Sequence, residues 1–242
     1  MILLFVAQSA RAQTMPATAP STQGAKGKLP FLDVDVKKRT VRMECESLNI
    51  TGPLEFLVCG TGKNEYESVL RSSARPSHLH LALIMIGLEP GKPIRYDEAK
   101  KEWLPPTGPP LKMTLEFEKD GKPVTLAATK TLRAMKDKRP MPDATWVFTG
   151  SKIMPEKKYA ADVTGYLVSI VNFELTPIDF PALESNANET LLWETNNQVL
   201  PPTGTKVTLV IQPAEKVVAP PATTAPKGGP ASQPARGGGF GR

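Results

Sequence analysis

Short apolar runs rich in β-branched residues, separated by turns that contain proline and glycine, recur along the chain and limit it to a β-rich fold. In the clearest run, Leu111–Phe117, apolar side chains alternate with polar ones. A period of two is typical of a strand with one face on a core and the other in solvent. The same criteria predict strands at Phe31–Val36, Thr40–Ser47, Leu54–Val58, Leu111–Phe117, Val124–Ala128, Thr145–Phe148, Gly165–Val171 and Lys206–Ile211.

One segment, Pro76–Gly87, departs from this rhythm. Proline at its start and glycine at its end enclose mostly apolar residues, which predicts a buried helix. A fully buried strand is the alternative for an apolar run of this length. We therefore predict a mainly β (α+β) domain of antiparallel strands, with one prominent buried helix near residues 76–87.

Charge divides the chain into a neutral centre and two basic ends. The whole chain has a net charge of +6, yet residues 29–212 carry 23 basic and 23 acidic side chains. Residues 13–28 are predicted to be a flexible leader, and residues 213–242 a disordered tail rich in proline, alanine and glycine. Because the excess charge lies in the ends, composition argues against a nucleic-acid interface on the folded domain.

The first residues predict export. An apolar run, Ile2–Ala7, is followed by Ala10-Arg11-Ala12, which has the A-x-A pattern of a signal-peptidase site, with cleavage before Gln13. Because residues 1–12 are short for a signal peptide and lack a basic start, we interpret them as a remnant whose start codon lies upstream. The expected location is periplasmic or extracellular. No other segment has the ~18 consecutive apolar residues of a transmembrane segment.

The motif Leu-Pro-Pro-Thr-Gly occurs twice, at residues 104–108 and at 200–204, each time before a predicted strand. A sortase signal would need a membrane span and a basic tail directly after the motif, and neither copy has them. We interpret the motif as a strand entry in which Pro-Pro holds an extended approach and Thr-Gly makes the turn.

The chain contains two cysteines, Cys45 and Cys59. A hairpin that turns at Gly52 would place them opposite each other on paired strands, at a separation close to that of a disulfide. Two interpretations stay open, a disulfide and a pair of buried free thiols. Two cysteines are too few for an iron–sulfur cluster held by this chain alone.

A series of further short motifs runs through the central domain. In chain order they are Gly52–Glu55, Cys59, Lys63, Glu67-Ser68, Ser77–Gly91, Trp146–Ser151, Ala161–Gly165, Val171-Asn172 and Leu200–Thr205. In this order the chain resembles the YdjY-type domain family of exported bacterial proteins. The resemblance covers roughly residues 30–212 and implies a single exported domain without an assigned reaction. The chain departs from the family at Tyr66, where a His-Glu-Ser sequence is expected.

The candidate polar cluster consists of Lys63, Glu67, Ser68 and His80. A serine, a histidine and an acid would form a catalytic trio if a strand at Glu67–Leu70 packs on the helix start. However, Ser68 is not on a G-x-S-x-G elbow and no oxyanion donors are evident. In the structural alternative, Ser77 caps the helix, His80 bonds a buried carbonyl and Glu67 accepts backbone amides near the helix N-terminus.

The only histidines are His78 and His80. On a helix their side chains point about 200° apart, so they cannot bind one metal ion. On a strand they would share a face, and Glu67 could complete a metal site. Because the helix is favoured, we predict no metal site and no cofactor.

The leading functional hypothesis is a non-enzymatic binding or envelope-associated module, whose partner is an envelope protein or a small ligand. It depends on the neutral domain, the family resemblance and the incomplete catalytic constellation. The alternative is a hydrolytic or metal-dependent enzyme that uses Glu67, Ser68, His78 and His80. No residue is assigned as catalytic.

Overall fold

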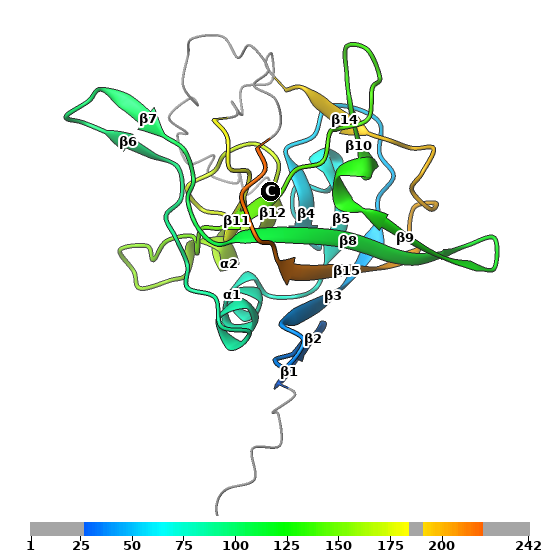
Figure 1. The fold of residues 1–242 in the computed structure, drawn as a ribbon, viewed down its shortest axis with the longest axis horizontal. Coiled ribbons are helices and arrows are strands. Elements are labelled where there is room, and N and C mark those ends of the chain that lie inside the picture. Colours follow the sequence, from blue (N-terminus) through cyan, green and yellow to red (C-terminus); the bar gives the residue numbers. More distant parts are fainter. Residues whose placement is uncertain (1–26, 184–190, 220–242) are drawn as a thin grey trace, which may run out of the picture.

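Strands dominate the computed structural model, which describes residues 27–183 and 191–219 (Figure 1). The predicted signal remnant, most of the leader and the last part of the tail lie outside the described residues. The helical segments are η1 (Glu65–Glu67), α1 (Pro76–Met85), η2 (Ala128–Thr131) and α2 (Ala160–Thr164). The strands are β1 (Gly27–Leu29), β2 (Leu32–Asp35), β3 (Thr40–Ser47), β4 (Phe56–Gly60), β5 (Ser68–Ser72), β6 (Arg95–Asp97), β7 (Glu102–Leu104), β8 (Pro110–Lys119), β9 (Lys122–Ala127), β10 (Leu132–Ala134), β11 (Trp146–Phe148), β12 (Tyr166–Ser169), β13 (Ile178–Asp179), β14 (Trp193–Thr195) and β15 (Lys206–Pro213).

The mainly β prediction with one prominent helix is confirmed, and each predicted strand overlaps an observed one. The described structure continues past residues 29–212 at both ends. Gly27 and Lys28, assigned to the leader, pair with β2. At the other end, the backbone N–H of Val218 donates to Thr145 Oγ1 at 2.9 Å, so the chain stays attached beyond residue 212.

The main sheet closes on itself. Its order is β1-β2-β3-β15-β8-β11-β13-β12-β4-β5, and β5 pairs again with β3. This closure is possible because β3 is long. Along one edge of β3, residues Thr40–Met43 pair with β2. Further along the same edge, Glu46 and Ser47 pair with β5. We call the strands from β3 round to β5 the closed sheet. Closure leaves these strands without the free edges that promote aggregation.

The interior of the closed sheet is the hydrophobic core. Along β3, the side chains of Val41, Met43 and Cys45 are buried, while Arg42 and Glu44 between them face outward. Trp146 is fully enclosed in the core, and its indole Nε1 donates to the carbonyl of Ser169 at 2.9 Å. The alternation predicted from the sequence thus separates the core from the outer face.

Helix α1 contacts β1, β2, β12 and α2 and lies below the sheet in the view of Figure 1. It buries Leu79, Ala82 and Leu83 in the core. The predicted cap by Ser77 is wrong, because Arg75 holds the N-cap position without a side-chain bond. Asp162 of α2 caps the N-terminus of α1 instead, because its Oδ1 accepts the backbone N–H of Ser77 at 2.8 Å. A carboxylate there is stabilised by the helix dipole.

The two Leu-Pro-Pro-Thr-Gly copies enter β8 and β15, which are antiparallel neighbours in the closed sheet. Both copies precede a strand, as predicted. The predicted turn is present at Thr203-Gly204, whereas Thr107 of the first copy forms a β-bridge with Lys92 instead. The second copy is tied to β3, since Gly204 donates to the carbonyl of Ser47 at 2.8 Å and the Thr203 hydroxyl to that of Leu48 at 2.6 Å.

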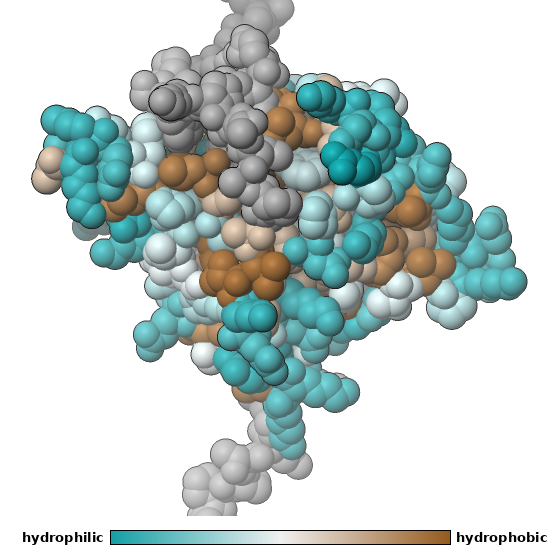
Figure 2. Space-filling view, turned by 45° about the horizontal axis from the view of Figure 1, so that its top comes forward, coloured by the Kyte–Doolittle hydropathy of each residue, from teal (hydrophilic) through white to brown (hydrophobic). Residues whose placement is uncertain are grey.

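Two hairpins, β6–β7 and β8–β9, project from opposite sides of the body in Figure 1. Figure 2 shows that the surface of both projections is mostly hydrophilic, whereas apolar patches are scattered over the body. Within residues 27–183 and 191–219, no helix is long and apolar enough to cross a membrane.

Candidate functional site

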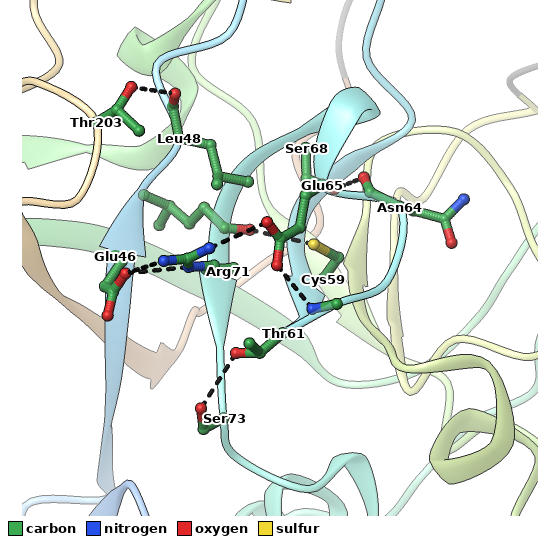
Figure 3. Close-up of polar contacts among 12 residues, drawn as sticks. Glu46, Leu48, Cys59, Thr61, Asn64, Glu65, Ser68, Arg71, Ser73 and Thr203 are labelled. Carbon is green, nitrogen blue, oxygen red and sulfur yellow. Dashed lines mark hydrogen bonds and ion pairs between the residues drawn. The ribbon is translucent and has the colours of Figure 1, made fainter.

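Ser68, the serine of the predicted polar cluster, lies at the start of β5 and is fully buried. Its Oγ donates to the carbonyl of Asn64 at 2.7 Å, which closes the turn that leads from β4 through η1 into β5 (Figure 3). The hydroxyl is therefore occupied within its own turn and is shielded from solvent.

An ion-pair network surrounds this turn (Figure 3). The guanidinium of Arg71 donates to Glu46 Oε2 through Nε at 3.0 Å and through Nη2 at 2.6 Å. Its Nη1 reaches Glu65 Oε2 at 3.1 Å, and Glu65 Oε1 accepts the backbone N–H of Gly62 at 2.7 Å. The network ties β3, β5 and the turn before η1 together. Sequence reasoning missed it because the three charged residues belong to separate elements and share no motif.

Lys63 lies on an exposed turn, where its backbone N–H donates to the carbonyl of Gly60 at 3.0 Å. Its side chain crosses Gly165, and a Cβ added at Gly165 would lie 2.5 Å from Lys63 Cγ. Gly60 also donates to the carbonyl of Gly165 at 2.7 Å. The glycine therefore allows β4 and the lysine stem to approach the end of α2 closely.

Glu67 lies near Tyr166 on β12 rather than at the helix. Burial and then the negative charges of Glu55 and Glu67 raise the pKa of Tyr166 to about 12. Since Asp162 accepts the backbone N–H at the start of α1, the predicted contact of Glu67 with the helix N-terminus is wrong.

His80 lies on α1 among aromatic residues. Its ring meets Phe148 and Tyr159 edge-on, with ring centroids 5.1 Å and 5.4 Å apart. His80 Nδ1 is 3.0 Å from the Tyr159 hydroxyl, which donates to the carbonyl of Gly150 at 3.1 Å. Because the hydroxyl's one hydrogen is directed at Gly150, Nδ1 is assigned as the donor to Tyr159. Burial lowers the pKa of His80 and raises that of Tyr159, so both rings are neutral near pH 7.

The described residues do not assemble a metal site. His78 and His80 lie two positions apart on α1, as predicted, and His78 Nδ1 is buried without a hydrogen-bond partner in the part of the chain that the structure describes. No group of three or more His, Cys, Asp or Glu side chains there could hold a metal ion.

The predicted cluster divides into two places. Glu67 and Ser68 lie where η1 meets β5, whereas His80 packs against the end of β11 and the segment after it. In the sheet order, β13, β12 and β4 separate β11 from β5. The trio of serine, histidine and acid is therefore not brought together.

The predicted hairpin between Cys45 and Cys59 is wrong. Strand β5 lies between β3 and β4, pairing antiparallel with β3 and parallel with β4. Two strand spacings separate the cysteine backbones by roughly 9 to 10 Å, beyond the ~7 Å that a disulfide can span. Both thiols are free and buried.

We expect both thiols to be unreactive in the folded protein. Burial raises the pKa of Cys45 to about 12 and that of Cys59 to about 11, and only the thiolate reacts with a disulfide reagent. Titration with Ellman's reagent should detect no thiol under native conditions and two per chain in urea. Rapid native labelling, or a mass lower by two hydrogens without reductant, would contradict this expectation.

A buried carboxyl that sequence reasoning missed, Asp179, ends β13 and is inaccessible to solvent. Its Oδ1 accepts the Ser169 hydroxyl at 2.7 Å, the Asn172 side-chain amide at 3.2 Å and the backbone N–H of Phe180 at 2.7 Å. Its Oδ2 accepts the backbone N–H of Phe173 at 3.3 Å. Together these bonds fix the tight connection between the parallel strands β12 and β13. Asn172, part of a motif noted in the sequence, was the only available signal.

Comparison with known proteins identifies one family. The family model described as YdjY domain matches residues 32–212. No curated protein and no solved structure matches the chain. The match covers the closed sheet except Pro213, together with α1 and α2.

Proposed function

This chain belongs to the YdjY domain family, and from that premise we propose that its domain is a non-enzymatic binding module that works outside the cytoplasm. The observation that supports this proposal is that the candidate polar side chains already have structural roles. Ser68 closes a turn, His80 bonds Tyr159, and Asp162 caps α1. General acid–base chemistry needs such groups within reach of one reacting atom. Here Ser68 lies on β5, and three strands separate β5 from β11, against which His80 packs.

The proposed location outside the cytoplasm is supported by the Ala10-Arg11-Ala12 pattern. Oxidising compartments promote disulfides between accessible thiols. Cys45 and Cys59 are both buried, on strands separated by β5, so the folded domain tolerates such a compartment. N-terminal sequencing of the protein from a periplasmic or secreted fraction should begin at Gln13, and recovery from the cytoplasm alone would contradict export.

A double-mutant cycle tests whether His80 is structural. We expect His80→Phe and Tyr159→Phe each to lower the free energy of unfolding by about 1 kcal/mol, the usual contribution of one hydrogen bond. The two losses should be less than additive, because both substitutions remove the same bond. Urea unfolding of the four proteins measures this coupling.

Measurements of hydrolytic activity and metal content test the proposal against the enzyme alternative. The full chain should contain no stoichiometric metal and should not hydrolyse ester or peptide substrates, and the Ser68→Ala and Glu67→Gln variants should differ from it only in stability. Turnover that Ser68→Ala abolishes in a folded protein would overturn the proposal. So would a bound metal ion that His80→Phe removes without changing the melting temperature.

A further inference from the structure

An open groove with a volume of about 490 Å³ lies beside the β1–β2 hairpin. Its lining includes Arg42 and Glu44 of β3 and Thr208 of β15, which alternate with side chains that face the core. Leu29 and Phe31 supply an apolar part of the lining. The groove therefore lies on the outer face of the closed sheet and combines apolar and charged surface.

Phe31 is held in this groove at a cost in backbone strain. It follows Pro30 in the two-residue turn between β1 and β2 and has a φ of 63°. Proline followed by a residue with positive φ is the pattern of a type II turn, in which glycine normally takes the second position. A bulky residue there is an outlier, and the ring is 44% exposed. Strained residues of this kind cluster at functional sites.

The lining has an excess of negative charge. Arg42 is already paired, since its Nη2 donates to Glu116 Oε2 at 2.5 Å. Asp33 and Glu44 are exposed. Asp33 lies opposite Arg42 in the strand register, and its charge, after that of Glu116, raises the pKa of Arg42. Two carboxylates thus face the groove against one guanidinium that Glu116 neutralises.

We propose that this groove binds a basic peptide segment of a partner protein. A lysine or arginine of the peptide lies between Asp33 and Glu44, and an apolar side chain beside it packs on Leu29 and Phe31. The aromatic face also attracts a cation directly. This inference rests on the binding function proposed above and names its site and the chemistry of its partner.

The open shape of the groove favours a peptide segment over a small ligand. Small ligands are usually held in enclosed pockets that bury most of their surface, whereas this groove is open.

The test measures binding of a labelled synthetic peptide in which lysine alternates with leucine, by fluorescence anisotropy on the full chain. We expect the Asp33→Asn/Glu44→Gln double variant to bind at least tenfold more weakly. Glu118→Gln, which removes an exposed carboxylate of β8 outside the groove, is the matched control and should bind normally. Affinity should also fall as salt is raised, because exposed charges are screened.

Phe31→Gly separates binding from folding. Glycine accepts the positive φ of this turn without strain, so the melting temperature should stay the same or rise, while peptide affinity falls at least tenfold. Unchanged affinity in both groove variants would overturn the site and leave the binding function standing, whereas catalytic turnover by the Ser68 region would overturn the binding function itself.

The chain's own basic tail is the competing occupant. If the wild type binds no peptide, but a full-length variant with Lys227, Arg236 and Arg242 changed to glutamine does, the groove holds the tail and the partner proposal is wrong. Equal affinity of the wild type and this variant supports an external partner. A peptide with glutamate in place of lysine should not bind, and binding of that peptide would contradict the role of charge.

Discussion

Gly91→Ala is expected to lower the free energy of unfolding by about 4 kcal/mol or more, at the upper end of single-substitution effects. An added Cβ would lie 2.0 Å from the carbonyl oxygen of Thr107 and 2.5 Å from Gly108 Cα. These are backbone atoms held by two hydrogen bonds between Lys92 and Thr107, and Gly91 itself donates to the carbonyl of Phe148 at 2.9 Å. Relieving the clash requires these bonds to break, and they attach the segment before β6 to β11 and to the residues that precede β8.

Gly121→Ala is the matched control. Gly121 has a φ of +70° in the β8–β9 turn, and a Cβ there would have no atom within 4 Å. Only the backbone conformation is penalised, by about 1 kcal/mol. Urea unfolding followed by circular dichroism compares the two variants with the wild type. Similar losses for both would show that the close approach at Gly91 relaxes at little cost.

Asp179→Asn is expected to change the pH dependence of stability. Burial raises the pKa of Asp179 to about 7, against the opposing hydrogen bonds from Ser169, Phe180, Asn172 and Phe173. Since the unfolded carboxyl titrates near ~3.9, the folded state binds the proton more tightly. The contribution of Asp179 is therefore complete below about pH 4 and is lost as the pH rises to about 7, by roughly 4 kcal/mol. Asparagine does not titrate, so this loss should be missing in the variant.

The measurement is the difference in unfolding free energy between wild type and Asp179→Asn, taken from pH 4 to pH 8. The difference should shrink as the pH rises to about 7 and then stay constant. Using a difference cancels the opposite contribution of Asp162 and Glu194, whose lowered pKa values stabilise the fold as the pH rises. A difference independent of pH would show that Asp179 stays ionised, held by its four donors.

The strands that sequence analysis located well are those with sustained alternation. The predicted bounds Thr40–Ser47 are those of β3, and Lys206–Ile211 falls within β15. Strands of two or three residues, such as β6, β7, β10, β13 and β14, were missed because so short a segment shows no period. They form only where a partner strand or the core holds them in place.

The candidate site was less predictable than the fold. Ser68 and His80 are close in sequence and belong to the same series of motifs. In the sheet, however, three strands lie between β5, which contains Ser68, and β11, against which His80 packs. The pairing of β4 with β5 instead of β3 separated the cysteines as well. Arg71 with Glu46, and Asp179 with Ser169, come together only through sheet pairing.

The sequence by itself determined the β-rich class, the position of α1 and the neutral character of the domain, because alternation, helix-end residues and charge are local properties of the chain. The tertiary structure alone decided which strands are neighbours, and thereby which polar groups meet. Strand order depends on how the whole set of apolar faces can close around one core. Closure placed β5 beside β3, enclosed Asp179, and left Phe31, Asp33 and Glu44 together around an open groove.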